Sequence, residues 1–292
     1  MNDMNERVCV VTGATNGIGK ITAHALAQMG ATVVIIARNK RKAKDAVEGI
    51  ISASNNDSVS YLIADLSSLD QIHGAAQAFK EKHDHLHLLV NNAGRFVTRR
   101  STSVDGFELT FATNLLNYFL LTHLLLDTLR ASGTPQLNSR IVNVASSAHL
   151  SVSLDFDDLQ NENTYSPRSV YGQTKLMNIM FTYELARRLV DEDANTIANA
   201  VHPGFVRTGL GRDNNGLPGL LYRIALFALR PMQGSAEEGA QTLIYAASSP
   251  KIEGLTGKYL VDSLITSTSD SSMIATDWVR LWKISERLVG IS

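Results

Sequence analysis

Short apolar runs alternate with amphipathic helical patterns along most of the chain, and this alternation restricts the fold more than any other feature. Runs rich in β-branched residues occupy 8–12, 32–37, 58–63, 88–90, 140–145, 196–201 and 257–261. Helical patterns lie between them, at about 21–29, 40–52, 69–82, 107–129 and 171–190. Apolar strands separated by helices indicate a parallel sheet that is covered on both faces. We therefore predict a doubly wound α/β fold that forms a single domain over residues 1–292.

A glycine-rich turn follows the first of these strands. Residues 12–19 read Thr-Gly-Ala-Thr-Asn-Gly-Ile-Gly and lead directly into the first helical pattern. Glycines let the backbone approach a pyrophosphate without a Cβ clash, and the N–H groups at the helix start bind its charge. The turn therefore predicts a Rossmann-type dinucleotide site that includes Gly13, Thr15, Asn16, Gly17, Ile18 and Gly19. A plain tight turn is the alternative, because the spacing is Gly-x3-Gly-x-Gly rather than the general Gly-x-Gly-x-x-Gly.

The end of the second strand bears on which dinucleotide binds. An acidic residue at this point hydrogen-bonds the adenosine ribose of NAD(H), but residues 37–40 here read Ala-Arg-Asn-Lys. The guanidinium of Arg38 suits the 2′-phosphate of NADP(H). We expect Arg38 and Asn39 to contact the cofactor and NADP(H) to be preferred, with NAD(H) as an alternative. A solvated basic loop without a ligand would give the same local sequence.

A tyrosine and a lysine four residues apart point to acid–base chemistry. Tyr171 and Lys175 stand in Tyr-Gly-Gln-Thr-Lys, so on a helix their side chains share one face. A tyrosine with a pKa near 10 is a poor proton donor or acceptor at neutral pH unless its anion is stabilised. A neighbouring ammonium lowers the pKa of the phenol and makes it usable. Such pairs are also common on helix surfaces without any function, so the context has to decide.

The order of the motifs supplies that context. The glycine turn is followed by Asn91-Asn92-Ala93-Gly94, then by Asn114, Ser146, and Tyr171 with Lys175. In this order, and over nearly its whole length, the chain resembles the short-chain dehydrogenase/reductase superfamily. The resemblance extends to its retinol-dehydrogenase-like and protochlorophyllide-reductase-like members. It is carried by Phe-Ala-Thr-Asn at 111–114, Arg-Ile-Val-Asn-Val at 140–144 and Val-His-Pro-Gly at 201–204.

The resemblance implies a role for each catalytic candidate. Tyr171 exchanges a proton with the substrate oxygen, and Lys175 binds the nicotinamide ribose and lowers the pKa of the tyrosine. Ser146 hydrogen-bonds the same substrate oxygen, as an oxyanion donor does. Asn114 holds a water that links Lys175 to solvent. Ser147 is adjacent to Ser146, and an ungapped comparison selects Ser146.

Further cofactor contacts are also implied by the resemblance. The adenine is flanked by Asp65 and Leu66, and the adenosine side is lined by Asn91, Ala93 and Gly94. The nicotinamide side is lined by Pro203, Gly204, Val206 and Thr208.

These residues imply an NADP(H)-dependent oxidoreductase that transfers a hydride between nicotinamide and a small-molecule carbonyl or alcohol, with a hydrophobic aldehyde or ketone expected. An apolar segment near residues 209–232 would then be a substrate lid. A packed surface helix, a subunit contact and a weak membrane-surface contact are the alternatives for that segment. The alternative function is a non-catalytic NADP(H)-binding sensor or scaffold of the same fold, which usually accompanies loss of catalytic side chains that this chain retains.

Composition limits the partners and the location. With 27 basic and 28 acidic residues the formal net charge is −1, so no strong field favours nucleic acid. Cys9 is the single cysteine, which rules out an intrachain disulfide, and it stands in an apolar run that predicts a buried thiol. Residues 1–7 lack the apolar core of a secretory signal, and the apolar runs are too short to span a bilayer. We expect a cytoplasmic protein without a transmembrane segment.

The histidines and the oligomeric state are the last points. His83, His85 and His87 alternate, but no cysteine or carboxylate at ligand spacing accompanies them, so we expect no metal site. His149 and His202 are expected to form local hydrogen bonds or to shape the pocket. A homodimer could form through the helices that start at Phe107 and Tyr171, although nothing in the sequence requires it.

Overall fold

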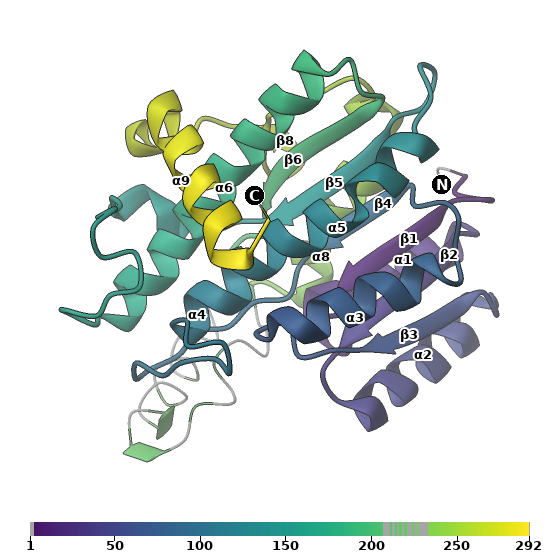
Figure 1. Cartoon of the computed structure of the whole chain (residues 1–292). Helices are drawn as coiled ribbons and strands as arrows, with labels where there is room; N and C mark the ends of the chain where they lie inside the picture. Colours follow the sequence, from purple (N-terminus) through teal and green to yellow (C-terminus); the bar gives the residue numbers. More distant parts are fainter. Residues whose placement is uncertain are drawn as a thin grey trace.

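The strands of the computed structural model form one sheet in the part of the chain that the structure describes, residues 3–206, 211, 214, 216–217, 219–220, 224, 227 and 233–291. The order is β3-β2-β1-β4-β5-β6-β7-β8, and every neighbouring pair is parallel except β7 and β8 (Figure 1). The strands are β1 (Val8–Thr12), β2 (Thr32–Ala37), β3 (Val59–Ile63), β4 (Leu88–Asn91), β5 (Ser139–Val144), β6 (Thr196–His202), β7 (Tyr259–Val261) and β8 (Leu264–Ile265). This confirms the predicted Rossmann-type α/β sheet.

Helices cover both faces of the sheet (Figure 1). One face carries α1 (Gly17–Gln28), α2 (Lys40–Ser54) and α8 (Ala236–Ser248). The other carries α3 (Leu69–Lys80), α4 (Leu109–Phe111), α5 (Asn117–Ser132) and α6 (Pro167–Asp191), and α9 (Ala275–Val289) packs against α6. An apolar core lies between the sheet and each of these layers. Burial on both sides explains why the strands are apolar throughout.

The first strand shows how complete this burial is. Every residue from Cys9 to Thr12 is fully buried, and burial raises the pKa of the Cys9 thiol to about 12. The thiol therefore packs as a small apolar side chain, as predicted.

The helix predicted at 107–129 is interrupted. Between α4 and α5 lies one π-helical turn, Ala112–Leu116, and such turns are frequent at functional sites. The stretch Leu109–Ser132 is long and apolar enough to cross a membrane, but 83% of its most apolar window is buried inside the protein. The core of the fold therefore accounts for its apolar character.

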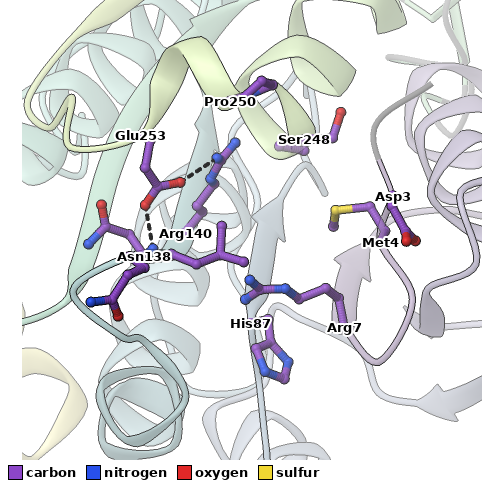
Figure 2. Close-up of a pocket in the computed structure, with 12 residues that line it drawn as sticks. Asp3, Met4, Arg7, His87, Asn138, Arg140, Ser248, Pro250 and Glu253 are labelled. Atoms are coloured by element: carbon purple, nitrogen blue, oxygen red, sulfur yellow. Dashed lines mark hydrogen bonds and ion pairs between the residues drawn. The ribbon is translucent and has the colours of Figure 1, made fainter.

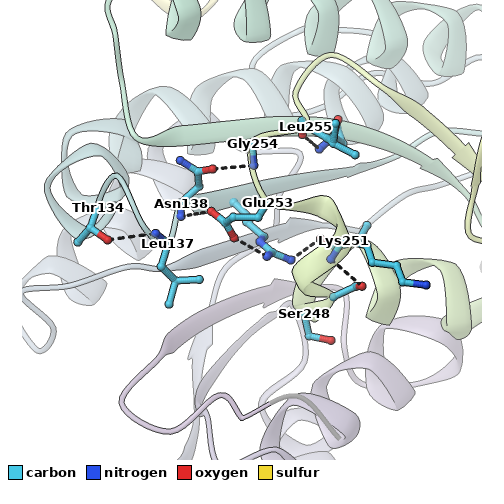
Figure 3. A network of polar contacts seen from close by, with 12 residues as sticks. Thr134, Leu137, Asn138, Ser248, Lys251, Glu253, Gly254 and Leu255 are labelled. Atoms are coloured by element: carbon cyan, nitrogen blue, oxygen red, sulfur yellow. Dashed lines mark hydrogen bonds and ion pairs between the residues drawn. The ribbon is translucent and has the colours of Figure 1, made fainter.

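A polar network lies at the amino-terminal edge of the sheet, where β1 and β5 begin. Arg140 at the start of β5 is 6% exposed and donates to Glu253 Oε2 at 2.8 Å (Figure 2). Glu253 also accepts from the backbone N–H of Asn138, whose side chain accepts from Gly254 N at 3.0 Å (Figure 3). A cavity of about 290 Å³ beside this network is lined by Arg7, which directly precedes β1. This edge lies at the opposite end of β1 from the glycine turn.

Candidate active site

The glycine turn packs against the segment that follows β4. Gly13 and Gly17 adopt positive φ angles of 67° and 55°, in the left-handed region that favours glycine. A Cβ on Gly13 would lie 2.8 Å from the Cα of Ala93, so no larger residue fits there. The turn and the Asn-Asn-Ala-Gly motif, 80 residues apart, therefore form one surface at the carboxyl ends of β1 and β4.

Two residues that the sequence analysis did not single out fix this arrangement. Thr12 Oγ1 accepts from the backbone N–H groups of Asn92 and Ala93, both at 2.9 Å. The amide of Asn92 in turn donates to Thr12 O at 2.8 Å. Their positions immediately before the first glycine and inside the asparagine motif were the available signal.

The turn fits a dinucleotide. The side chain of Asn16 makes no capping hydrogen bond at the start of α1, so it does not occupy the first-turn N–H groups of Gly17 to Gly19. Such groups bind phosphate oxygens. Gly13 N donates to Ile36 O at 3.0 Å, which joins the turn to the end of β2, where Arg38 is exposed. A bound dinucleotide would thus have phosphate donors and a guanidinium along one edge.

Asn39 has a structural task beside Arg38. Its side chain accepts from Lys42 N at 3.0 Å and caps α2. The exposed guanidinium of Arg38 is therefore the better candidate for cofactor contact at this corner.

Asp65 and Leu66 follow β3 at the same edge of the sheet. Asp65 Oδ1 accepts from the backbone and the hydroxyl of Ser67, at 3.0 and 2.7 Å. Its Oδ2 lies 3.9 Å from the guanidinium of Arg95, which follows the asparagine motif. Leu66 is 6% exposed and packs in the core. The ion pair links the loop after β3 to the loop after β4.

Asn91 links the central strands of the sheet to a helix. The residue is fully buried, and its amide donates to Thr122 Oγ1 and Asn143 Oδ1, each at 2.9 Å. Asn143 continues the chain of bonds to Thr182 Oγ1 on α6 at 3.0 Å. The side chain of Asn91 therefore ties β4 to β5 and α5, and its contact with the adenosine side stays a prediction. The sequence did not reveal this because each partner lies 31 or more residues away.

Lys175 is the most perturbed cation of the site. It is 3% exposed, and its Nζ donates to Val144 O at 2.7 Å. The same Nζ lies 5.6 Å from the ring centroids of Tyr171 and Tyr118. Burial lowers the pKa of Lys175 to about 7. No carboxylate among the described residues forms an ion pair with it, so Lys175 can exchange a proton near neutral pH.

Asn114 joins three segments from the π-helical turn. Its Nδ2 donates to Arg95 O and to Thr174 Oγ1, both at 3.0 Å, and its Oδ1 accepts from Arg95 N at 2.7 Å. Thr174 in turn donates to Tyr171 O at 2.8 Å. The side chain of Asn114 thus positions α6 and the loop after β4, a bonding pattern that the sequence analysis missed. A Cβ on Gly94 would lie 3.8 Å from Lys175 Nζ, which places the predicted cofactor surface beside this cluster.

Ser146 leaves β5 just before a 3-10 helix, Ser147–Ser151. It is partly exposed and its Oγ accepts from Ala148 N at 3.3 Å. A Cβ on Gly172, the residue after Tyr171, would lie 2.8 Å from Ala148 O. The 3-10 helix and α6 therefore touch directly beside Tyr171. The structure joins Asn114 to the backbone of Tyr171 through Thr174, places Lys175 beside the Tyr171 ring, and places Ser146 in the segment against which α6 packs.

The nicotinamide side is described in part. Pro203, Gly204 and Val206 follow β6, and Val206 Cγ1 lies 2.8 Å from where a Cβ on Gly239 of α8 would stand. Thr208 lies outside the described residues, as does most of the predicted lid at 209–232. Within that lid, Asn214 donates to Phe96 O at 2.8 Å. The ring of Phe96 meets the ring of Tyr171 edge-on at 5.8 Å, so Asn214 is attached next to the candidate catalytic tyrosine.

The family follows from comparison with known proteins. The sequence profile of the short chain dehydrogenase family matches residues 7–216. The chain belongs to the short-chain dehydrogenase family. Human polyprenol dehydrogenase is 40% identical over 98% of this chain and 86% of its own length. Human retinol dehydrogenase 12 is also 40% identical, over 98% of this chain and 87% of its own.

Two solved structures share the fold of this chain. The Pseudomonas aeruginosa RhlG/NADP complex is 27% identical with a TM-score of 0.70, covering 88% of this chain and 95% of its own. An uncharacterised Mycobacterium paratuberculosis protein is 30% identical with a TM-score of 0.79, over 99% and 96% of the two chains. The family resemblance predicted from the motifs is confirmed, and with it an NAD(P)(H)-using oxidoreductase.

Proposed function

We propose that this short-chain dehydrogenase transfers a hydride between NADP(H) and a hydrophobic aldehyde or ketone, or the corresponding alcohol. The observation that carries the proposal is the buried Lys175 ammonium, 5.6 Å from the centre of the Tyr171 ring and held on Val144 O. A cation beside a phenol favours the phenolate and so makes the tyrosine an acid–base group at neutral pH.

Each residue has a defined task in the proposed reaction. A bound nicotinamide supplies or accepts the hydride. Tyr171 exchanges a proton with the substrate oxygen. Lys175, with its pKa near 7, stabilises the phenolate form of Tyr171 when it is charged. Ser146 donates a hydrogen bond to the same oxygen and stabilises the charge that develops on it. Asn114 keeps α6 and the loop after β4 in register.

Apolar side chains support a hydrophobic substrate. Phe96 contacts Tyr171, and Leu150, which lies in the 3-10 helix after Ser146, is 59% exposed. Phe205, on the predicted nicotinamide side, is 51% exposed. Retinol and polyprenol dehydrogenases are among the relatives. NADP(H) is proposed over NAD(H) because Arg38 stands where an acidic residue would otherwise bind the ribose.

The test follows NADPH oxidation with straight-chain aldehydes of increasing length, retinal, and aliphatic ketones. Tyr171→Phe should reduce kcat by about 10³-fold or more, and Ser146→Ala by about 10²-fold, because they remove the proton and one oxyanion donor. The dissociation constant of NADPH, measured by fluorescence, should stay within about twofold. Tyr245→Phe on α8 is the matched control and should leave kcat unchanged.

Two results would redirect the proposal. Equal turnover by Tyr171→Phe and the wild type would contradict the role of the tyrosine. Tight NADPH binding without turnover of any carbonyl would instead support the sensor or scaffold alternative.

A further inference from the structure

His149 lies between the candidate catalytic serine and the C-terminal loop, residues 266–274. It is fully buried in the 3-10 helix that follows Ser146. Its Nδ1 is 2.7 Å from Ser146 O, and its Nε2 is 3.2 Å from Ser269 N. Both ring nitrogens are thus used, and they join segments 120 residues apart in the sequence.

The partners define the state of the imidazole. A backbone N–H can only donate, so Nε2 must accept from Ser269 and carries no proton. A carbonyl oxygen can only accept, so Nδ1 must carry the proton that is donated to Ser146 O. The ring is therefore neutral with its proton on Nδ1. Burial lowers the pKa of His149, opposed by the hydrogen bond to Ser146, which agrees with the neutral form.

Among the residues that the structure describes, no ion pair involves His149, and its neighbours come from two other strands. The ring of Tyr259 on β7 meets it edge-on at 5.2 Å. His202 at the end of β6 also lies within electrostatic range, and burial lowers its pKa as well. The charge of Asp262 acts on His202 and raises its pKa, in opposition to burial. The contact with Tyr259 fixes the plane of the His149 ring and so the direction of both hydrogen bonds.

Ser146 is held from both sides along its backbone. Upstream, Val144 O accepts from Lys175, and Ala145 N donates to Val201 O at 2.8 Å. Downstream, the carbonyl of Ser146 accepts from the ring of His149 and, at 3.3 Å, from its backbone N–H. The position of the serine hydroxyl relative to Tyr171 therefore depends on His149.

The C-terminal loop is in turn attached to two helices. Thr268 Oγ1 bonds to Tyr183 Oη on α6 at 2.9 Å and accepts from Ser272 Oγ at 2.7 Å. Trp278 Nε1 on α9 donates to Ser272 O at 2.6 Å. Ser269, one residue after Thr268, is thus placed by contacts with α6 and α9. Its backbone N–H, which donates to His149 Nε2, orients the His149 ring in turn.

We propose that His149 is a positioning residue, which holds the Ser146 backbone and makes the geometry of the catalytic serine depend on the C-terminal loop. It touches neither substrate nor cofactor and acts through Ser146. The inference rests on the proposed function for its catalytic consequence, whereas the link from His149 to Ser269 stands by itself.

The first test compares single variants with saturating NADPH and decanal. His149→Ala should lower kcat about 10- to 50-fold, less than loss of an oxyanion donor itself, because Ser146 remains present but misplaced. The dissociation constant of NADPH should change less than about twofold. His149→Asn can still donate to Ser146 O from its amide, whereas His149→Gln extends beyond it. The expected order of kcat is therefore wild type, Asn, then Gln and Ala together.

The second test separates positioning from a general structural defect. In a Ser146→Ala background, His149→Ala should lower the residual kcat by less than about threefold, because both changes act through one hydroxyl. A full 10- to 50-fold loss in that background would overturn the proposal. The matched control is His87→Ala, which removes a hydrogen bond from Val8 N at the opposite edge of the sheet. It should leave the kcat of the folded protein unchanged.

A third measurement needs no turnover. Hydrogen exchange of the Ser269 amide should accelerate about tenfold or more in His149→Ala and remain slow in Ser146→Ala and His87→Ala. Unchanged exchange in His149→Ala would overturn the link. If no aldehyde is reduced by the wild type, the proposed function fails, while this measurement still decides whether His149 holds Ser269.

Discussion

At the scale of single residues, Lys175 shows that the site is built at the expense of stability. An ammonium that is 3% exposed and has a carbonyl rather than a carboxylate as its partner is costly to bury. The depressed pKa of about 7 expresses that cost. The residue is thus maintained by its chemistry rather than by its contribution to folding.

Replacing Lys175 by Met should therefore stabilise the cofactor-free protein while abolishing turnover. Between the folded pKa of about 7 and the ordinary lysine pKa of 10.5, the unfolded chain binds more protons, so the stability of the wild type rises with pH. Lys175→Met lacks this dependence. Its advantage should be about 2–4 kcal/mol at pH 6.5 and should shrink by pH 9.5. Urea unfolding at the two pH values measures it, and a difference independent of pH would contradict the argument.

Arg38 should set the cofactor preference. Arg38→Gln removes the guanidinium proposed for the 2′-phosphate, so kcat/KM for NADPH should fall about 10- to 100-fold, as expected for a charge-assisted contact. The value for NADH should change little. Arg41→Gln, an exposed neighbour on α2, is the control. Equal losses with both cofactors would show that Arg38 does not read the phosphate.

The residue types of the site could be predicted from the sequence, but their partners could not. The four-residue spacing of Tyr171 and Lys175 implies one helix face, which local geometry alone decides. The bonds of Asn114 to Arg95 and Thr174 span 19 and 60 residues, and no periodicity encodes them. The interior position of Asn91 was missed for the same reason.

At the scale of elements, the seven parallel strands were predictable because burial on both faces makes them apolar throughout. The two-residue β8 is exposed and exists only through its pairing with β7, so it left no pattern. α8 was overlooked although Ser235 and Glu238 form a capping box at its start. The π-helical turn at Asn114 shares the apolar pattern of α5 and could not be distinguished from it.

The contact of α6 with the 3-10 helix gives a prediction about an element. Gly172→Ala would place a Cβ 2.8 Å from Ala148 O and 3.0 Å from Val152 Cγ1. We expect the free energy of unfolding to fall by about 1–3 kcal/mol, because α6 and the segment after Ser146 must separate. The same displacement should lower kcat. Thermal unfolding and steady-state kinetics measure the two effects.

Gly74 on α3 provides the matched control. A Cβ there meets nothing within 4 Å, so Gly74→Ala should stabilise the protein by about 0.5–1 kcal/mol through helix propensity alone. If both alanine variants were stabilised alike, the close approach at Gly172 would not constrain the site.

At the scale of the whole molecule, α9 covers helices that could otherwise pair with a second copy. Trp282 contacts Phe119 of α5 and Phe181 of α6, with ring centroids 4.9 and 5.8 Å apart. The guanidinium of Arg188 on α6 lies over the ring of Trp282, 4.2 Å from the ring centroid. The apolar surface between α5 and α6 is thus satisfied within the chain.

We therefore expect no dimer through α5 and α6. Light scattering after size exclusion should give a mass near 31.8 kDa at micromolar concentration. A stable mass of twice that value for the wild type would contradict the expectation and support the predicted homodimer.

The candidate active site and the N-terminal segment lie at opposite ends of the strands. The glycine turn, Ser146 and Tyr171 gather at the carboxyl ends of the strands, whereas Asp3, Met4 and Arg7 lie at the opposite end, near the Arg140–Glu253 ion pair (Figure 2). Anchoring the protein to a bead or a fusion partner by its N-terminus would accordingly leave the candidate active site facing the solution and accessible to substrate.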